Sequence, residues 1–79
     1  MEVKVKYFGA IAEQAGIGEE TLDLTTIGSE VKDIKAYCIQ KYNLTTDDSM
    51  QVAINQELNK EGKLRAGDEI AFLPPFAGG

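Results

Sequence analysis

Two strand patterns, one at each end of the chain, place the strongest constraint on the fold. The segment Glu2–Phe8 alternates: one face carries Val3, Val5 and Tyr7, and the other carries Glu2, Lys4, Lys6 and Phe8. A period of two indicates a half-buried strand. The segment Glu69–Leu73 is a second, mostly apolar run, and the prolines that follow it prevent the strand from continuing. The sequence therefore predicts a sheet that contains both ends of the chain.

Between these two strands, the first part of the chain predicts a short helix and a second strand. Ala10–Ala15 is typical of one or two helical turns, with Gly16 as a C-terminal glycine cap. Glu20–Leu24 predicts a strand that pairs antiparallel with the first.

The main helix is expected after Ser29, a residue that can cap its N-terminus, with acidic Glu30 and Asp33 near its positive end. Its apolar stripe recurs at helical spacing and consists of Val31, Ile34, Cys38 and Tyr42. We expect the helix to end near Tyr42-Asn43. Because Cys38 lies on this stripe, we interpret it as a small core residue rather than a nucleophile.

The remaining chain predicts a third strand and two turns. In Gln51–Ile54, Val52 and Ile54 should point inward, and turns are expected at Asn55-Gln56 and at Ala66-Gly67-Asp68. The order β-β-α-β-(β)-β favours an α+β protein of the β-grasp, ubiquitin-like type, in which one helix crosses a mixed sheet. The first and last strands should then be parallel neighbours. We expect a domain over residues 1–75 and a flexible tail over 76–79.

Size and charge restrict the classes of function. A chain of 79 residues makes one small domain, and eight Lys and Arg against thirteen Asp and Glu give a net charge of −5. Without a basic run, nucleic acid is a poor partner, whereas a basic protein surface would be attracted. The single cysteine and the absence of a long apolar run predict a cytoplasmic protein without a membrane partner.

The residues that usually perform catalysis are scarce. The chain has no histidine, two serines (Ser29 and Ser49) and the lone Cys38. These cannot form a Cys/His metal site, and there is no glycine-rich phosphate loop, so we expect no cofactor or metal bound by this chain. The sequence indicates a protein on which enzymes act.

The last residues suggest how enzymes could act on it. The sequence finishes with Pro74-Pro75-Phe76-Ala77-Gly78-Gly79. Prolines make a stiff exit from the last strand, and two glycines make a thin tip that can enter a narrow channel. The functional group would then be the carboxylate of Gly79.

In these motifs the chain resembles the MoaD family, the β-grasp sulfur carriers that form the small subunit of molybdopterin synthase. The likeness covers almost the whole length and lies in Val5-Lys6-Tyr7-Phe8-Gly9, Ala53-Ile54-Asn55-Gln56-Glu57-Leu58, Leu64-Arg65-Ala66-Gly67-Asp68-Glu69-Ile70-Ala71-Phe72 and the Pro-Pro-Phe-Ala-Gly-Gly tail. The proline pair favours this family over other diglycine carriers. One departure is Ala12, where family members often have a basic residue.

The resemblance implies a specific chemistry. An E1-like enzyme would use ATP to adenylate Gly79, and sulfur would then replace the adenylate to leave a thiocarboxylate. Gly78 would allow access to the partner's active site. The large subunit, which would supply the acid–base groups, would use this sulfur to form the dithiolene of molybdopterin. The complex would contain two small and two large subunits.

A docking surface is predicted where the tail leaves the domain. Phe8 and Leu73 lie on the outward phase of their strands and, if those strands are parallel, should be neighbours. Leu58 and Phe76 could extend them into one exposed apolar patch, beside the exit formed by Pro74 and Pro75. Such patches often mark partner sites. The alternative is that Phe8 only tucks under the following helical turn.

Three functions remain open at this point. The first is a molybdopterin sulfur carrier that acts as a non-catalytic subunit of a sulfurtransferase. The second is a carrier for thiamine or tRNA thiolation, or a ubiquitin-like protein modifier. The third is a β-grasp interaction module with an inert tail.

Overall fold

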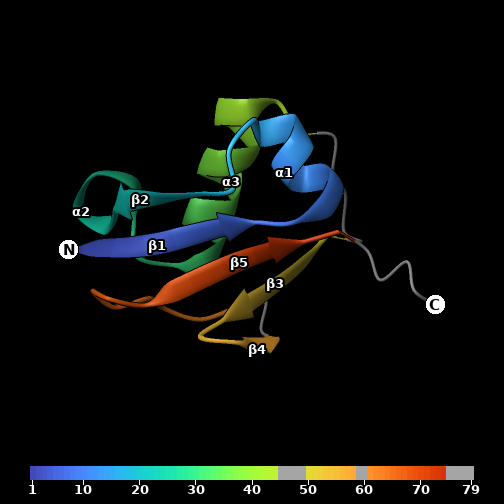
Figure 1. Cartoon of the computed structure of the whole chain (residues 1–79). Helices are drawn as coiled ribbons and strands as arrows, with labels where there is room; N and C mark the ends of the chain where they lie inside the picture. The colour runs from blue at the N-terminus through green and yellow to red at the C-terminus, as the bar shows by residue number, and fades with distance from the viewer. Residues whose placement is uncertain (45–49, 59–60, 75–79) are drawn as a thin grey trace.

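The computed structural model describes residues 1–44, 50–58 and 61–74, and this part of the chain forms a five-stranded sheet crossed by one main helix (Figure 1). Its elements are β1 (Glu2–Tyr7), α1 (Gly9–Ala15), β2 (Glu19–Asp23), α2 (Leu24–Ile27), α3 (Val31–Tyr42), β3 (Gln51–Ile54), β4 (Glu57–Leu58) and β5 (Glu69–Leu73). Within these residues, no helix is long and apolar enough to cross a membrane.

The strand order is β2-β1-β5-β3-β4. β1 and β5 are parallel neighbours, and the other three pairings are antiparallel. The two strands with the clearest sequence patterns therefore lie side by side, as predicted, and the end of β5 is beside the end of β1. This mixed sheet with its crossing helix is the β-grasp fold, which confirms the predicted fold class.

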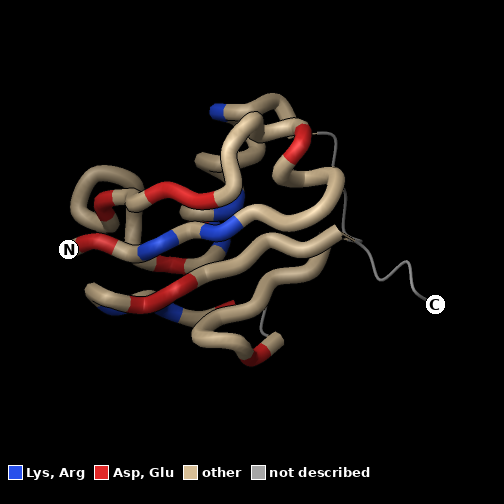
Figure 2. Tube along the Cα trace, viewed as in Figure 1, with Lys and Arg blue, Asp and Glu red and all other residues tan. Residues whose placement is uncertain are grey.

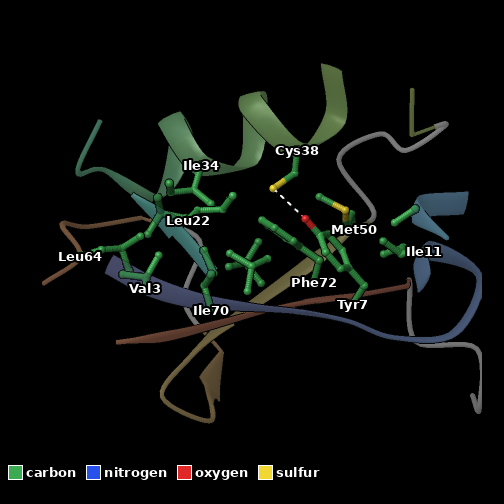
Figure 3. Close-up of a cluster of buried hydrophobic side chains, with 14 of the residues drawn as sticks. Val3, Tyr7, Ile11, Leu22, Ile34, Cys38, Met50, Leu64, Ile70 and Phe72 are labelled. Atoms are coloured by element: carbon green, nitrogen blue, oxygen red, sulfur yellow. Dashed lines mark hydrogen bonds between the residues drawn. The ribbon is translucent and has the colours of Figure 1, made fainter. Parts of the chain in front are cut away.

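The core lies between the sheet and the helices (Figure 3). Its fully buried members include Val3, Val5, Val31, Ile34, Cys38, Met50, Val52, Ile70 and Phe72. Those from β1 come from the alternate positions that the sequence predicted to face inward. Those from α3 come from its predicted apolar stripe. Burial of these aliphatic and aromatic groups is the main stabilising term of the fold.

The start of α3 differs from the prediction by one residue. The N-cap is Glu30 rather than Ser29, and the Asp33 carboxylate accepts a hydrogen bond of 3.2 Å from the Glu30 N–H. Ser29 instead lies at a bend before the helix, and its carbonyl accepts from the Leu64 N–H at 2.7 Å. The predicted end is confirmed, because Asn43 caps the helix in a left-handed conformation (φ 52°).

The boundaries near α1 and β2 also shift slightly. Phe8 is not part of β1 but caps the N-terminus of α1 with extended backbone angles. Gly16 ends α1 at φ 80°, as predicted. Leu24 does not belong to β2 but begins α2, a short helix that the sequence reasoning missed. The Asp23 carboxylate accepts from the Thr25 N–H at 2.9 Å and so caps it.

The predicted turn at Asn55-Gln56 joins β3 to β4. Both residues have positive φ (50° and 73°), the geometry of a tight hairpin turn. Ile54 was predicted to be buried with Val52. It does share the inner face, but it is only partly buried, because β3 ends there next to the short strand β4.

Candidate functional site

The outer face of the sheet, opposite the core, brings together most of the predicted docking residues that the structure describes. Tyr7 pairs with Phe72 in the parallel β1–β5 register, so the next residues, Phe8 and Leu73, are neighbours at the ends of these strands. The Phe8 N–H donates to the Phe72 carbonyl at 3.2 Å, which fixes this alignment. Phe8 is 44% exposed, so it does not simply tuck under α1.

Leu58 lies on the same face but farther from the exit of the tail. It pairs with Ala53, which in turn pairs with Ala71, so one row of the outer face runs across β5, β3 and β4. Two strands separate Leu58 from Phe8, and Phe8 lies two residues beyond Lys6, the β1 residue in the row of Leu58, so their backbones are about 16 Å apart. We call these five residues, Phe8, Ala53, Leu58, Ala71 and Leu73, the outer-face patch.

The centre of the outer-face patch consists of small, buried side chains, and its two sides consist of larger and more exposed ones. Ala53 and Ala71 are each 8% exposed although they do not belong to the core cluster. Leu58, in contrast, is 68% exposed, more than any other large apolar side chain in the described part of the chain. Neighbouring side chains on the outer face therefore cover most of the two alanines. Sequence reasoning missed the two alanines, although their outward phase in β3 and β5 could have identified them.

Pro74 leads the chain out of β5 beside the start of α1. A Cβ atom added to Gly9 would lie 3.1 Å from the Cγ atom of Pro74, and Gly9 has φ +56°. A glycine is therefore needed for close contact between these two segments. The contact fixes the place at which the chain leaves the sheet, a role that the sequence analysis did not assign to Gly9.

Four predicted site residues, Pro75, Phe76, Gly78 and Gly79, lie outside the described residues. The boundary expected between the domain and its tail falls there as well. The structure shows that the described chain reaches Pro74 at the edge of the outer-face patch, next to Phe8 and Leu73.

Charged residues of β1 and β5 lie toward the other end of these strands, away from this exit (Figure 2). Lys4 lies 3.7 Å from Glu19, and Lys6 lies 3.4 Å from Glu69. All four side chains are between 30% and 56% exposed, so these pairs contribute little to stability. The outer face is thus apolar at Phe8 and Leu73, near the exit, and charged toward the other end of β1 and β5, where Lys6 is paired with Ala71.

A polar cluster lies on the inner side of the sheet, below the β1 end of the patch. The Glu20 carboxylate accepts hydrogen bonds from the hydroxyls of Tyr7 (2.6 Å) and Tyr42 (2.7 Å) and from Lys41 Nζ (2.9 Å). The Tyr7 hydroxyl also hydrogen-bonds with Cys38 Sγ at 3.1 Å, and its ring stacks on Phe72 with centroids 6.0 Å apart (Figure 3). The cluster holds β1, β2 and α3 together.

These contacts shift the ionisation of the cluster. Burial alone would raise the pKa of Glu20, but the three hydrogen bonds outweigh it and lower the pKa below the ordinary value. Burial raises the pKa of the Cys38 thiol to about 11, so it is protonated at neutral pH. Burial, helped by the bonds to Cys38 and Glu20, also raises the pKa of Tyr7. The prediction that Cys38 is a core residue is confirmed by its complete burial.

Ala12 occupies the position at which members of the resembled family often have a basic residue. It is half-buried on α1 and packs against the core. Two shallow pockets lie elsewhere in the described chain. One is lined by Glu30, Lys32, Glu61 and Gly62, and the other by Asn55, Gln56 and Glu69. Neither lies at the outer-face patch. The geometry that remains is a group of apolar side chains beside the point at which the chain leaves the sheet.

The class defined by this fold and surface is a ubiquitin-like protein with an apolar patch on its sheet. The family model described as "ThiS family" matches residues 5–79. The chain therefore belongs to the ThiS family, which includes the MoaD proteins.

Relatives with known names support this assignment. The chain is 37% identical over 86 aligned residues, which cover all of both chains, to the molybdopterin synthase sulfur carrier subunit of Chlamydomonas reinhardtii. Among solved structures, it is similar to small archaeal modifier protein 1 of Methanosarcina acetivorans (30% identity, 99% of this chain, 96% of that chain, TM-score 0.77). It is also similar to a chain in the complex of subunits 1 and 2 of molybdopterin-converting factor from Helicobacter pylori (25% identity, all of both chains, TM-score 0.70).

Proposed function

We propose that this chain is the sulfur carrier subunit of a molybdopterin synthase. The observation that carries the proposal is the full-length relationship to the Chlamydomonas reinhardtii sulfur carrier subunit. The terminal Gly78-Gly79 of the sequence supplies the chemical group that such a role requires. The cytoplasm is the place in which we expect this function.

The reactive group is the carboxylate of Gly79. A carboxylate is a poor electrophile, so an E1-like partner joins it to the AMP portion of ATP and releases pyrophosphate. A sulfide sulfur then attacks the activated carbonyl carbon, and AMP leaves. If the donor is a persulfide, the attack first gives an acyl disulfide, and a second thiol of the donor protein must reduce its S–S bond, forming a disulfide on the donor, to release the sulfur on Gly79. The product is a thiocarboxylate whose sulfur is ionised near neutral pH and is a better nucleophile than the oxygen that it replaces. This chain contributes the acyl group and the thin Gly78 approach, and ATP binds to the activating enzyme.

The large subunit then receives the tail and uses its sulfur to build the dithiolene on the pyranopterin precursor. In Helicobacter pylori, subunits 1 and 2 of molybdopterin-converting factor form a complex. We propose the corresponding partner here, in a heterotetramer of two small and two large subunits. The acid–base groups belong to the large subunit, because the present chain has no histidine and its one thiol is buried.

The outer-face patch is the proposed docking surface. Its exposed Phe8 and half-buried Leu73 lie beside Pro74, and Pro75 and Phe76 continue the chain toward the tip. Leu58, which is 68% exposed, provides a second anchor on the far side of Ala53 and Ala71. Apolar anchors next to a functional tail tend to dominate binding energy. The same surface would serve the activating enzyme, so the two partners should compete for this chain.

The test uses variants of the tail. Deleting Gly79, or adding one residue after it, should abolish sulfur transfer in a reaction reconstituted with the activating enzyme and the large subunit. The thermal midpoint should stay within about 1 °C of the natural chain, because terminal residues contribute little to a core. Full cofactor synthesis by the extended variant, with its extra residue still present by mass, would sink the proposal.

A second function is favoured by one observation, the similarity to small archaeal modifier protein 1. The same activated Gly79 could be attacked by a lysine amine of another protein, which would form an isopeptide bond and release AMP or sulfide. A cell lysate with the activating enzyme and ATP would distinguish the two functions. A modifier would give heavier covalent conjugates that contain this chain, whereas a dedicated sulfur carrier would give only the thiocarboxylate.

A further inference from the structure

The strand β2 forms an open edge of the sheet, on the side of β1 away from the outer-face patch. It is the first strand in the order β2-β1-β5-β3-β4, so the described residues place no strand beyond it (Figure 1). It has five residues, without proline, glycine or lysine. At the opposite edge, β4 has only two residues. An open strand of this kind presents unpaired backbone groups to a partner.

The hydrogen bonds between β1 and β2 identify which backbone groups are unpaired. The Tyr7 N–H donates to the Gly18 carbonyl (2.8 Å), and the Leu24 N–H donates to the Met1 carbonyl (2.7 Å). Bonded and non-bonded pairs alternate in an antiparallel ladder. Glu19 and Thr21 therefore direct both their N–H and their C=O groups away from β1, and Asp23 directs its N–H there.

The side chains on the outer side of this edge are acidic. Glu19 and Asp23 flank Thr21, and all three are exposed. Glu19 has a distant partner in Lys4 at 3.7 Å, and Asp23 lies 3.8 Å from the N-terminal amine. An incoming strand with basic side chains at alternate positions would place a cation opposite each carboxylate.

On the inner side, the edge adjoins α3. Lys41 bonds to Glu20 of β2, and its Nζ atom lies 5.6 Å from the centre of the Tyr37 ring, which is 37% exposed. Side chains at the other alternate positions of an incoming strand would face this helix surface, on which the Tyr37 ring is the exposed large apolar group. The preference for a basic strand therefore rests on the acidic outer side of the edge, and a small apolar residue such as Val is suited to the alternate positions.

The same charges disfavour a second copy of this chain at the edge. If two β2 strands paired antiparallel about Thr21, Glu19 of each copy would face Asp23 of the other. Like charges directly opposite in a sheet are destabilising. We propose that the β2 edge binds an extended basic segment of a partner protein by strand addition, with main-chain hydrogen bonds to Glu19 and Thr21. This site is separate from the outer-face patch and does not depend on the proposed sulfur-carrier function.

The test is an NMR titration of the full chain, labelled with 15N, with a capped heptapeptide of alternating Lys and Val. The matched control peptide alternates Glu and Val. The basic peptide should bind saturably with a dissociation constant of about 1 mM or tighter, shift the amide signals of Glu19, Thr21 and Asp23, and slow exchange of the Thr21 amide hydrogen. The acidic peptide should not bind. Absence of saturable binding, or shifts confined to Phe8 and Leu73, would overturn the proposal.

Two variants separate strand addition from simple charge attraction. Thr21→Pro removes an N–H that β1 does not use, so the fold should persist while the basic peptide binds roughly tenfold more weakly or worse. Thr21→Val keeps the N–H and should bind within about twofold of the natural chain. Glu19→Gln should weaken binding roughly two- to fivefold.

A peptide modification repeats the test without altering the protein. N-methylation of the peptide residues whose amides face the edge should abolish binding, whereas methylation of the alternate residues should leave it intact. Equal binding of both methylated peptides, or undiminished binding to a folded Thr21→Pro variant, would show that β2 does not accept a strand.

Discussion

The two faces of the sheet differ in how far their side chains are exposed, although the same strands contribute to both. In β1, Val3, Val5 and Tyr7 face inward and are at most 3% exposed. In the same segment, Lys4 and Phe8 face outward and remain exposed. The inner residues are constrained by packing in the core beneath α3. Packing of this kind does not account for Phe8, an aromatic residue whose side chain is exposed at an outer position. We expect the inner face to determine stability, and we propose that the outer face mediates binding.

β5 shows the same division at closer range. Ile70 and Phe72 belong to the buried core cluster, but Ala71 between them lies on the outer face and outside that cluster. Its small side chain is nevertheless almost covered by neighbouring residues. If the two faces are functionally separate, substitutions should change stability or binding, but not both.

The largest expected loss of stability comes from the inner face. Ile34→Ala removes a side chain that is fully buried between α3 and the sheet, and should lower the free energy of unfolding by about 2–5 kcal/mol. Ile54→Ala should lower it by roughly half as much or less, since Ile54 is only partly buried. Urea denaturation measures both, with the exposed Gln40→Ala as the control. Losses below about 0.5 kcal/mol at Ile34 would show that this face does not form the core.

A smaller and pH-dependent loss should follow Glu20→Gln, which removes a carboxylate that accepts three hydrogen bonds. We expect a cost of about 1–3 kcal/mol at neutral pH. Because the folded-state pKa is lowered, the contribution is complete above the ordinary value of 4.5 and is lost as the pH falls through the folded-state value. Denaturation curves from pH 7 to pH 3 should therefore converge for the two proteins. A constant difference would contradict this account.

The smallest expected change in free energy is on the outer face. Phe8→Ala or Leu73→Ala should weaken binding to the large subunit by at least about 1 kcal/mol, and the free energy of unfolding should change by less than about 0.5 kcal/mol. Lys4→Ala, on the same face but away from the exit, is the control and should bind normally. Isothermal titration calorimetry measures the affinities. Unchanged affinity for both variants would place the docking surface elsewhere.

The sequence predicted those parts of the fold that leave a periodic or turn signal. The alternation in β1, the stripe of α3 and the left-handed cap at Gly16 were all confirmed. The cap of α3 was assigned to Ser29 because hydroxyl residues are good caps. In the structure, the Ser29 carbonyl accepts a hydrogen bond from the distant Leu64 N–H, a contact that no local pattern encodes. The helix is capped by the next residue. The short α2 was missed, although Asp23 could have signalled its start.

The candidate site was predictable only in part. The outward phase of Phe8 and Leu73 follows from the alternation, and their proximity follows from the parallel pairing of β1 and β5. The distance of Leu58 from Phe8 depends on the strand order, and the contact of Gly9 with Pro74 depends on the path of the chain after β5. Both are long-range properties. The roles of Gly78 and Gly79 stay predictions of the sequence and of the family relationship.

The central claim is that the carboxylate of Gly79 becomes a thiocarboxylate. The most direct measurement is the intact mass of the full chain after co-expression with its activating enzyme, compared with a variant that lacks Gly79. The account predicts that the natural chain gains the mass difference of one oxygen replaced by one sulfur, that fragmentation places this change at Gly79, and that the variant gains nothing. An unmodified natural chain beside an active activating enzyme, or the same gain in the shortened variant, would contradict the account.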